Sequence, residues 1–230
     1  MSTYSKSILC LANSRRPGGT CFAGKEFASG KAFDWIRPIN AAHHGAVSDR
    51  DRLYQDNSHA DLLDIVSIAL KEPKPHLHHQ EDHQILDDKY WVKTGRATWE
   101  DVVKATDVVE GALWVNEGSI RHGQNDKVSE VSAAKLAGSL YLIEPKNLDL
   151  VVGKESAFQA PDIRRVRAKF TYNGTRYNFV VTDDPVEQAY FAKGGGTYRI
   201  NDVRLCVSLA EALNGNATKL VAAVITPDRV

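Results

Sequence analysis

The chain has 230 residues, enough for one large domain or two domains of roughly 100 residues each. Its 29 basic residues balance its 29 acidic residues, which argues against coating of long nucleic acid through a general basic field but leaves room for a local basic patch. None of the three cysteines sits in a CxxC pair, which excludes a zinc ribbon or thioredoxin-like motif.

The first apolar run, residues 8–12, is too short for a signal core or a membrane span. An odd number of cysteines in a chain of this length favours a reducing compartment. We therefore expect a cytoplasmic protein that makes no membrane contact.

Short apolar runs separated by turn signals predict strands in the first part of the chain, at residues 7–12, 20–27, 32–36 and 62–70. The glycines and proline at 17–19 predict a turn that already begins at Asn13. Residues 40–61 are polar and follow Arg37 closely, so we expect a long surface loop that closes over a ligand.

A helix is predicted from Trp99 to Trp114, because Thr98 is a suitable N-cap and two acids occupy the first turn. The following residues, up to 128, are polar and contain glycine. We divide the chain into an N-terminal barrel at 1–95, which includes the loop at 40–61, a helical and polar connector at 96–137, and a C-terminal barrel at 138–230.

The second half predicts further strands at 139–143, 147–152, 164–171, 176–182, 204–209 and 219–225, with a short helix at 184–191. Asn173-Gly174 is the strongest hairpin signal in the chain. The alternating strand–helix rhythm of a parallel α/β sheet is missing. The order of elements therefore predicts a mainly β protein with a few helices, built as two small β-barrels in tandem.

Several segments resemble the bacterial dual OB-containing domain family. The most specific part is the series Asn-Ser-Arg at 13–15, Cys-Phe-Ala-Gly at 21–24 and Trp-Ile-Arg-Pro at 35–38. Residues 64–70, 80–83, 90–91, 205–209 and 219–225 also fit, although Asp82-His83 stands where an acid–asparagine pair is expected. The resemblance implies two OB-like barrels packed in tandem, a nucleic-acid or nucleotide-binding role, and an association with bacterial antiviral defence and conflict systems.

Two segments of the first barrel, residues 11–25 and 35–38, lie beside glycine-rich turns and supply most of the candidate binding residues. Glycine lets backbone N–H groups approach a phosphate, arginine offers a bidentate fork, and tryptophan can stack on a base. The spacing is not that of a Walker A loop, because Gly24-Lys25 is followed by glutamate. The candidates here are Asn13, Ser14, Arg15, Arg16, Lys25, Trp35 and Arg37. The alternative is that Trp35 packs in the barrel and Arg37 makes a structural salt bridge.

A second basic surface is predicted on the strand at 164–171. Arg165, Arg167 and Lys169 alternate along it and share one face, and tyrosines flank the following hairpin. The alternative is an ordinary exposed face of a sheet.

Seven of the eight histidines precede residue 84, and His76 and His78 would lie on one face of a strand, as in some metal sites. Solvated loop histidines account for them more simply, so we expect no metal and no cofactor. The preferred hypothesis is a non-enzymatic protein that binds nucleic acid or a nucleotide-like ligand. Two alternatives stay open: an enzyme that processes nucleic acid or nucleotides through the histidine-rich segment, and a regulatory subunit of a protein effector.

Overall fold

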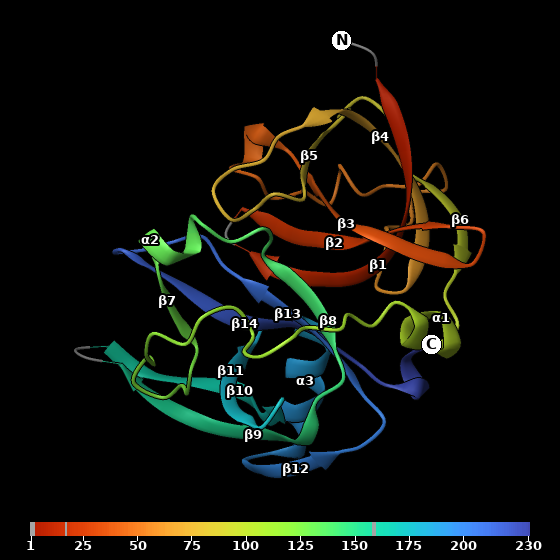
Figure 1. Ribbon diagram of the computed structural model, residues 1–230. Coiled ribbons are helices and arrows are strands. Elements are labelled where there is room, and N and C mark those ends of the chain that lie inside the picture. The colour runs from red at the N-terminus through yellow and green to blue at the C-terminus, as the bar shows by residue number, and fades with distance from the viewer. Residues whose placement is uncertain (1–2, 17, 158–159) are drawn as a thin grey trace. The chain divides into compact units, whose positions relative to one another are not determined.

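A computed structural model describes residues 3–16, 18–157 and 160–230, and the chain divides into two compact units (Figure 1). Unit 1 comprises Met1–Thr106, Ala137–Ser139 and Pro227–Val230, and unit 2 comprises Asp107–Leu136 and Leu140–Thr226. The segment predicted as a separate connector is thus divided between the two units. Residues 96–106 and 137 belong to unit 1, and residues 107–136 belong to unit 2.

The described residues of unit 1 form six strands, one short α-helix and two 3₁₀ turns. The strands are β1 (Tyr4–Arg16), β2 (Gly19–Ala28), β3 (Lys31–Ile39), β4 (Asp64–Pro73), β5 (Asp82–Ile85) and β6 (Val92–Arg96). The helical elements are η1 (Ala41–His43), α1 (Trp99–Lys104) and η2 (Pro227–Arg229). The strands pair in the order β1-β2-β3-β5-β4-β6, β1 also pairs with β4, and the β3–β5 step is parallel.

Strand β1 reaches both of its neighbours because it bends at its middle. Its register with β2 shifts between Cys10 and Ala12, and its first half pairs with β4. Gly24 of β2 faces this bend: a Cβ there would lie 1.9 Å from the carbonyl oxygen of Leu9. A glycine where two backbones approach so closely is typical of strongly bent sheets. The apolar residues of β1, Ile8 among them, form the centre of the core.

In the part of unit 2 that the structure describes there are eight strands and two helices. The strands are β7 (Lys127–Ser129), β8 (Leu140–Ile143), β9 (Lys146–Ala157), β10 (Ala160–Tyr172), β11 (Thr175–Val181), β12 (Gly196–Ile200), β13 (Arg204–Leu209) and β14 (Asn216–Ile225). The helices are α2 (Glu130–Ala133) and α3 (Asp184–Lys193). The pairing order is β12-β9-β10-β11-β14-β13-β8, and β7 pairs with β14.

The two units repeat one strand order. In unit 1 the order β1-β2-β3-β5-β4 contains a single parallel step, between the third and fifth strands. In unit 2 the order β9-β10-β11-β14-β13 places its parallel step, β11–β14, at the same point. The mainly β architecture with two OB-like sheets is therefore confirmed, although the sequence shows no internal repeat.

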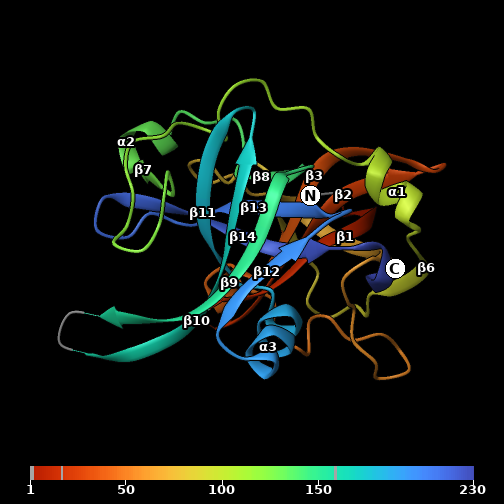
Figure 2. The same cartoon turned by 90° about the horizontal axis from the view of Figure 1, so that it is seen from below.

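The hairpin predicted at Asn173-Gly174 is confirmed. Tyr172 pairs with Thr175, so the loop has two residues, and both have positive φ, 46° at Asn173 and 77° at Gly174. Two such residues in succession match the twist of the strands that they join. Figure 2 shows β9 and β10 as a long antiparallel ribbon that extends past β11 and β12 of the same unit.

Two predicted elements end elsewhere. Residues 13–16 continue β1 and pair with β2 up to Arg16↔Gly19, so the expected turn at Asn13 is wrong. The helix predicted over 99–114 ends at Lys104. It stops because Asp107 takes part in unit 2 instead: its backbone N–H donates to the Leu142 carbonyl, and its carboxylate accepts from the Leu142 N–H.

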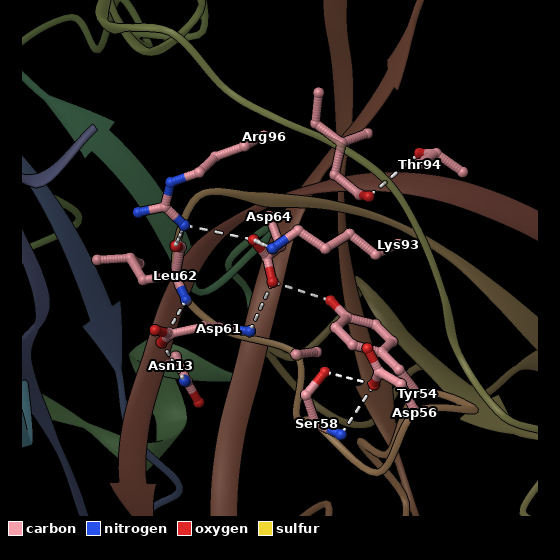
Figure 3. A network of polar contacts seen from close by, with 12 residues as sticks. Asn13, Tyr54, Asp56, Ser58, Asp61, Leu62, Asp64, Lys93, Thr94 and Arg96 are labelled. Atoms are coloured by element: carbon pink, nitrogen blue, oxygen red, sulfur yellow. Dashed lines mark hydrogen bonds and ion pairs between the residues drawn. The ribbon is translucent and has the colours of Figure 1, made fainter.

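Residues 40–61, expected as a loop that closes over a ligand, pack against the barrel of unit 1. Arg52, Tyr54 and Ala60 are buried. Figure 3 shows the polar contacts that hold this end of the segment, centred on Asp64 of β4. The Asp64 carboxylate accepts a hydrogen bond from the Tyr54 hydroxyl at 2.9 Å and lies 2.6 Å from the ammonium group of Lys93. Burial and this hydrogen bond raise the pKa of Tyr54.

Candidate functional site

Arg37 lies inside unit 1, on β3, and its guanidinium binds protein groups. The side chain is 2% exposed and donates to Glu81 at 2.7 Å, to Asp82 at 3.1 Å and to the Ser139 hydroxyl at 2.5 Å. Ser139 in turn donates to Glu81. The parallel pairing of β3 with β5 sets Arg37 opposite Asp82, which places the two charges together.

The Arg37 cluster holds two carboxylates around one guanidinium. Burial raises the pKa of Asp82 to about 7, the neighbouring Glu81 adds to this rise, and Arg37 opposes it. The balance follows from the cost of burying a carboxylate beside a second acid, a cost that Arg37 and, to a smaller extent, Arg16 offset. The cluster therefore holds β3 against β5 and Ser139. The two acids of the Gln80–His83 segment serve as the partners of Arg37.

The four candidates on β1 point in different directions. Asn13 donates to the Asp61 carboxylate at 3.2 Å and accepts from Arg52 at 3.2 Å, so it anchors the 40–61 segment. Ser14 is buried and Arg15 is exposed. Arg16 is half-buried and donates to the His44 carbonyl at 3.0 Å.

Lys25 and Trp35 lie opposite each other on β2 and β3. The ammonium group of Lys25 is 5.5 Å from the centre of the Trp35 ring and donates to the Ala105 carbonyl at 2.8 Å. Lys25 is 7% exposed, so its charge serves this contact with the end of α1. The structure thus brings Lys25 and Trp35 together, and it gives Arg37 and Asn13 partners in two other networks.

The basic strand of unit 2 presents its charges differently. Val166, Ala168 and Phe170 of β10 face the core, so Arg165, Arg167 and Lys169 share the opposite, outer face. Arg167 is 6% exposed; it binds both oxygens of Glu155 and lies 3.8 Å from Asp126. Among the residues that the structure describes, neither Arg165 nor Lys169 makes an ion pair.

A cavity of about 450 Å³ opens on this outer face, beside Lys169. Its lining comes from three adjacent strands and from the segment before β7. The residues are Gly123 and Gln124, Asn147 and Asp149 of β9, Lys169, Phe170 and Thr171 of β10, and Arg176, Tyr177 and Asn178 of β11. A volume of this size falls within the range of roughly 300–1,000 Å³ common for small-molecule sites.

Sequence reasoning missed Arg176, although a signal for it exists. Once Asn173-Gly174 is a two-residue turn, Thr171 faces Arg176 and Lys169 faces Asn178 across the hairpin. Facing residues point to the same side of a sheet, so Arg176 had to join Lys169 on the outer face. Gln124 could not be placed this way, because it reaches the sheet from the predicted connector, through a two-way backbone bridge to Asn178.

A buried ionic group lies beneath this face. Lys219 of β14 is fully buried and donates to Asn116 at 2.7 Å. Burial lowers its pKa to about 8, against the opposing effect of Asp126 and Glu117, and burial also raises the pKa of Asp126. Asp126 accepts from the Ile120 N–H, and its own carbonyl accepts from the Lys219 N–H. These contacts fix the segment that carries Gln124.

The histidines do not gather into a metal-ligating group. Within the described ranges, no three His, Cys, Asp or Glu side chains are arranged so as to hold a metal ion. His78 and His79 are buried and pack edge to face, and His83 bonds to the Tyr4 hydroxyl at 2.6 Å. Burial lowers the pKa of His83.

Comparison with known proteins identifies the family. The chain belongs to the family described as dual OB-containing domain, whose model matches residues 6–224. No curated protein and no solved structure matches. Among the described residues, no helix is long and apolar enough to cross a membrane.

Proposed function

We propose that this member of the dual OB-containing domain family binds nucleic acid or a nucleotide-like ligand, and that it does so mainly through the outer face of β9, β10 and β11. OB folds commonly bind oligonucleotides across the face of their second and third strands. In unit 2 those strands are β10 and β11, and this is the face that bears Arg165 and Lys169.

The observation that carries the proposal is the contrast between the two basic surfaces. Arg37 and Lys25 are buried and hold protein oxygens, so a phosphate would have to displace these partners before it could bind. Arg165 and Lys169 make no ion pair with described residues, and Lys169 lines a cavity. A ligand can bind these cations without breaking an internal ion pair, so this face favours an anionic ligand.

The unit 1 residues remain part of the proposal as a second surface. Arg15 is exposed at the end of β1, and Trp35 is half-buried beside Lys25. A strand that contacted Arg15 and Trp35 would stack on the indole without disturbing the Arg37 cluster. Ser14, Asn13 and Arg16 would then act by holding the backbone of β1 in place.

The experiment is a binding titration with fluorescently labelled short DNA and RNA oligonucleotides and with free nucleotides, at low and moderate salt. Replacing Arg165 and Lys169 together by glutamine is expected to weaken binding at least about tenfold and to reduce its salt dependence. Lys193→Gln is the control for each of the two substitutions made singly: it removes one positive charge from α3, where Lys193 stacks on Tyr190 and Tyr198. Tyr198 pairs with the core-facing Leu150, so this control lies on the other side of the sheet.

The absence of binding to any oligonucleotide or nucleotide at low salt would refute the proposal. If binding persists in the double variant and is lost in Arg15→Gln, the ligand surface belongs to unit 1. Retained near-ultraviolet circular dichroism shows in either case that the variants are folded.

The biological setting that the proposal includes is bacterial antiviral defence, in the cytoplasm and with a protein effector as a further partner. The support is the family resemblance alone. Loss of phage protection on deletion of the gene, restored by the wild-type chain and not by the Arg165/Lys169 double variant, is the expected result. Equal plaque counts with and without the gene, over a broad phage panel, would refute the proposed role in antiviral defence.

A further inference from the structure

The cavity on unit 2 is bounded on both sides across the strands. On one side, the segment before β7 runs along the edge of β11, because the backbone groups of Gln124 and Asn178 bond to each other in both directions. On the other side, Arg199 of β12 binds both oxygens of Asp149 on β9, at 2.6 and 3.1 Å. A space closed at both sides suits a compact group better than a continuous polymer that crosses the sheet.

The charge inside the cavity is positive. Its two cations, Lys169 and Arg176, are diagonal neighbours on the outer face. Its one acid, Asp149, is already neutralised by Arg199. Neither Lys169 nor Arg176 forms an ion pair with any residue that the structure describes. Two cations beside a single acid that already has Arg199 as its partner favour a group with a full double charge, since each added unit of charge strengthens its attraction to both.

The remaining polar lining consists of carboxamides. Gln124 and Asn147 are exposed, and Asn178 is held in place by its hydrogen bond to the His122 carbonyl at 2.7 Å. A carboxamide offers a donor and an acceptor side by side, which is the pattern on the edge of a nucleobase. A sulfate or another simple anion would bind the cations but would leave the donors of the carboxamides without a base edge to bind, and a neutral sugar would make no ion pair with the cations.

The walls are fixed before any ligand binds. Asn125 donates to the carbonyl of Arg176 at 3.0 Å, and Asp126 is fully buried, so the segment is tied to β11 and into the core. Gly123 lies so close to the Asp126 carboxylate that a Cβ would meet it at 1.6 Å. A preformed cavity lowers the entropic cost of binding a small group.

From this lining we infer that the cavity holds a single nucleotide with a terminal phosphate, either free or at the end of a strand. Lys169 and Arg176 bind the phosphate, and the carboxamides of Gln124 and Asn147 bind the base edge. This inference rests on the proposed function and narrows it: the protein recognises an end or a monomer, and internal phosphodiesters contribute only along the neighbouring Arg165.

The test compares ends. Oligonucleotides of one sequence are prepared with a phosphate at the 5′ end, at the 3′ end or at neither, and are titrated beside nucleoside monophosphates, nucleosides and inorganic phosphate. The expected result is at least about tenfold tighter binding of one phosphorylated end than of the hydroxyl end, because a charge-assisted contact is lost without it. A free monophosphate that competes as well as the strand end identifies a monomer ligand; a monophosphate that competes poorly identifies a strand end.

Two variants assign the effect to the cavity. Arg176→Gln is expected to abolish the preference for the phosphorylated end, and Gln124→Trp is expected to block binding by filling the mouth; both positions are exposed, so the fold is retained. Lys146→Gln at the start of β9 is the charge-matched control, because Lys146 is exposed and does not line the cavity. Equal affinity for all ends, with Arg165→Gln weakening binding and Arg176→Gln without effect, overturns this inference and leaves the proposed function intact. Failure of every probe to bind overturns both.

Discussion

Replacing Arg37 by methionine tests whether this residue serves the fold or a ligand. Methionine keeps an unbranched chain of similar length and removes the charge. The change removes the cation that Glu81 and Asp82 contact, leaves the two acids buried side by side, and takes one donor from Ser139. Breaking a buried ion pair by removing one partner typically costs about 3–5 kcal/mol. We expect the free energy of unfolding of unit 1 to fall by about 4 kcal/mol at pH 7.5, near the middle of that range.

The pH dependence of this loss follows from Asp82. Its folded pKa, about 7, lies above the ordinary value of about 4, so the folded state binds more protons across that window and its stability falls as the pH rises through it. Arg37 lowers this pKa, so without Arg37 the window extends above pH 7. The difference between Arg37→Met and the wild type should therefore grow above pH 7, by up to about 1.4 kcal/mol per pH unit.

The assay is urea denaturation followed by tryptophan fluorescence at pH 6 and pH 8, since Trp35, Trp91 and Trp99 all belong to unit 1. Arg15→Met is the control, an exposed arginine on β1 with an expected loss below about 0.5 kcal/mol. A loss below about 1 kcal/mol for Arg37→Met, or one that shrinks as the pH rises, would refute this reasoning. If that variant stayed stable and lost ligand affinity, Arg37 would be a binding residue, as its sequence pattern predicts.

Three further substitutions test other parts of the molecule. Asp82→Asn should flatten the fall in stability between about pH 4 and pH 7, measured as the pH dependence of the urea midpoint, because it removes the carboxyl whose folded pKa is raised; an unchanged slope would place the titration elsewhere. Gly24→Ala forces a Cβ against the Leu9 carbonyl and should cost about 3 kcal/mol, or prevent folding. Exposed Gly153→Ala on β9, where φ is not positive and no atom lies within 4 Å of the added Cβ, should cause no clash; equal melting temperatures of the two variants would contradict the close approach at Gly24. Tyr54→Phe removes a buried donor from Asp64 and should cost about 2 kcal/mol in urea denaturation, and a neutral outcome would show that Lys93 and Arg96 suffice.

The sequence predicts those features of the fold that depend on neighbouring residues. Asn173-Gly174 specifies its own turn, and with it the pairing of β10 and β11, because both residues tolerate positive φ. The class of the fold follows in the same way from short apolar runs between turn signals. The extent of β1 was underestimated because Asn13 and Arg16 are polar, and a strand that pairs tightly with its neighbour needs no apolar residues at its exposed end.

The partners of Arg37 depend on distant parts of the chain. Nothing near Trp35-Ile36-Arg37-Pro38 indicates that β3 will pair in parallel with β5, some 45 residues later, and set Asp82 against Arg37. The same holds for Ser139, which belongs to the cluster although the sequence places it at the start of the predicted C-terminal barrel. The charge pattern of one segment therefore identifies an arginine as a candidate binding residue. Only the order of the strands in the sheet shows whether an acid of the same chain neutralises that arginine.

The repeated strand order allows the cations of the two sheets to be compared position by position, according to whether an acid of the chain neutralises them. Two sheets with the same order have the same positions for charge on their second and third strands, and the sequence fills these positions differently. On β2 and β3, the cations Lys25 and Arg37 are buried and hold a carbonyl and two carboxylates. On β10, Arg165 and Lys169 lie on the outer face without an ion pair among described residues, and only Arg167 is tied to acids. A cation that already has a buried partner in the fold contributes little net free energy to ligand binding, since the ligand would have to offset the lost internal contact. Arg37 is therefore a structural arginine of unit 1, whereas Arg176 is the arginine of unit 2 that we propose for ligand binding, and the Arg37→Met and Arg176→Gln variants test these two roles separately.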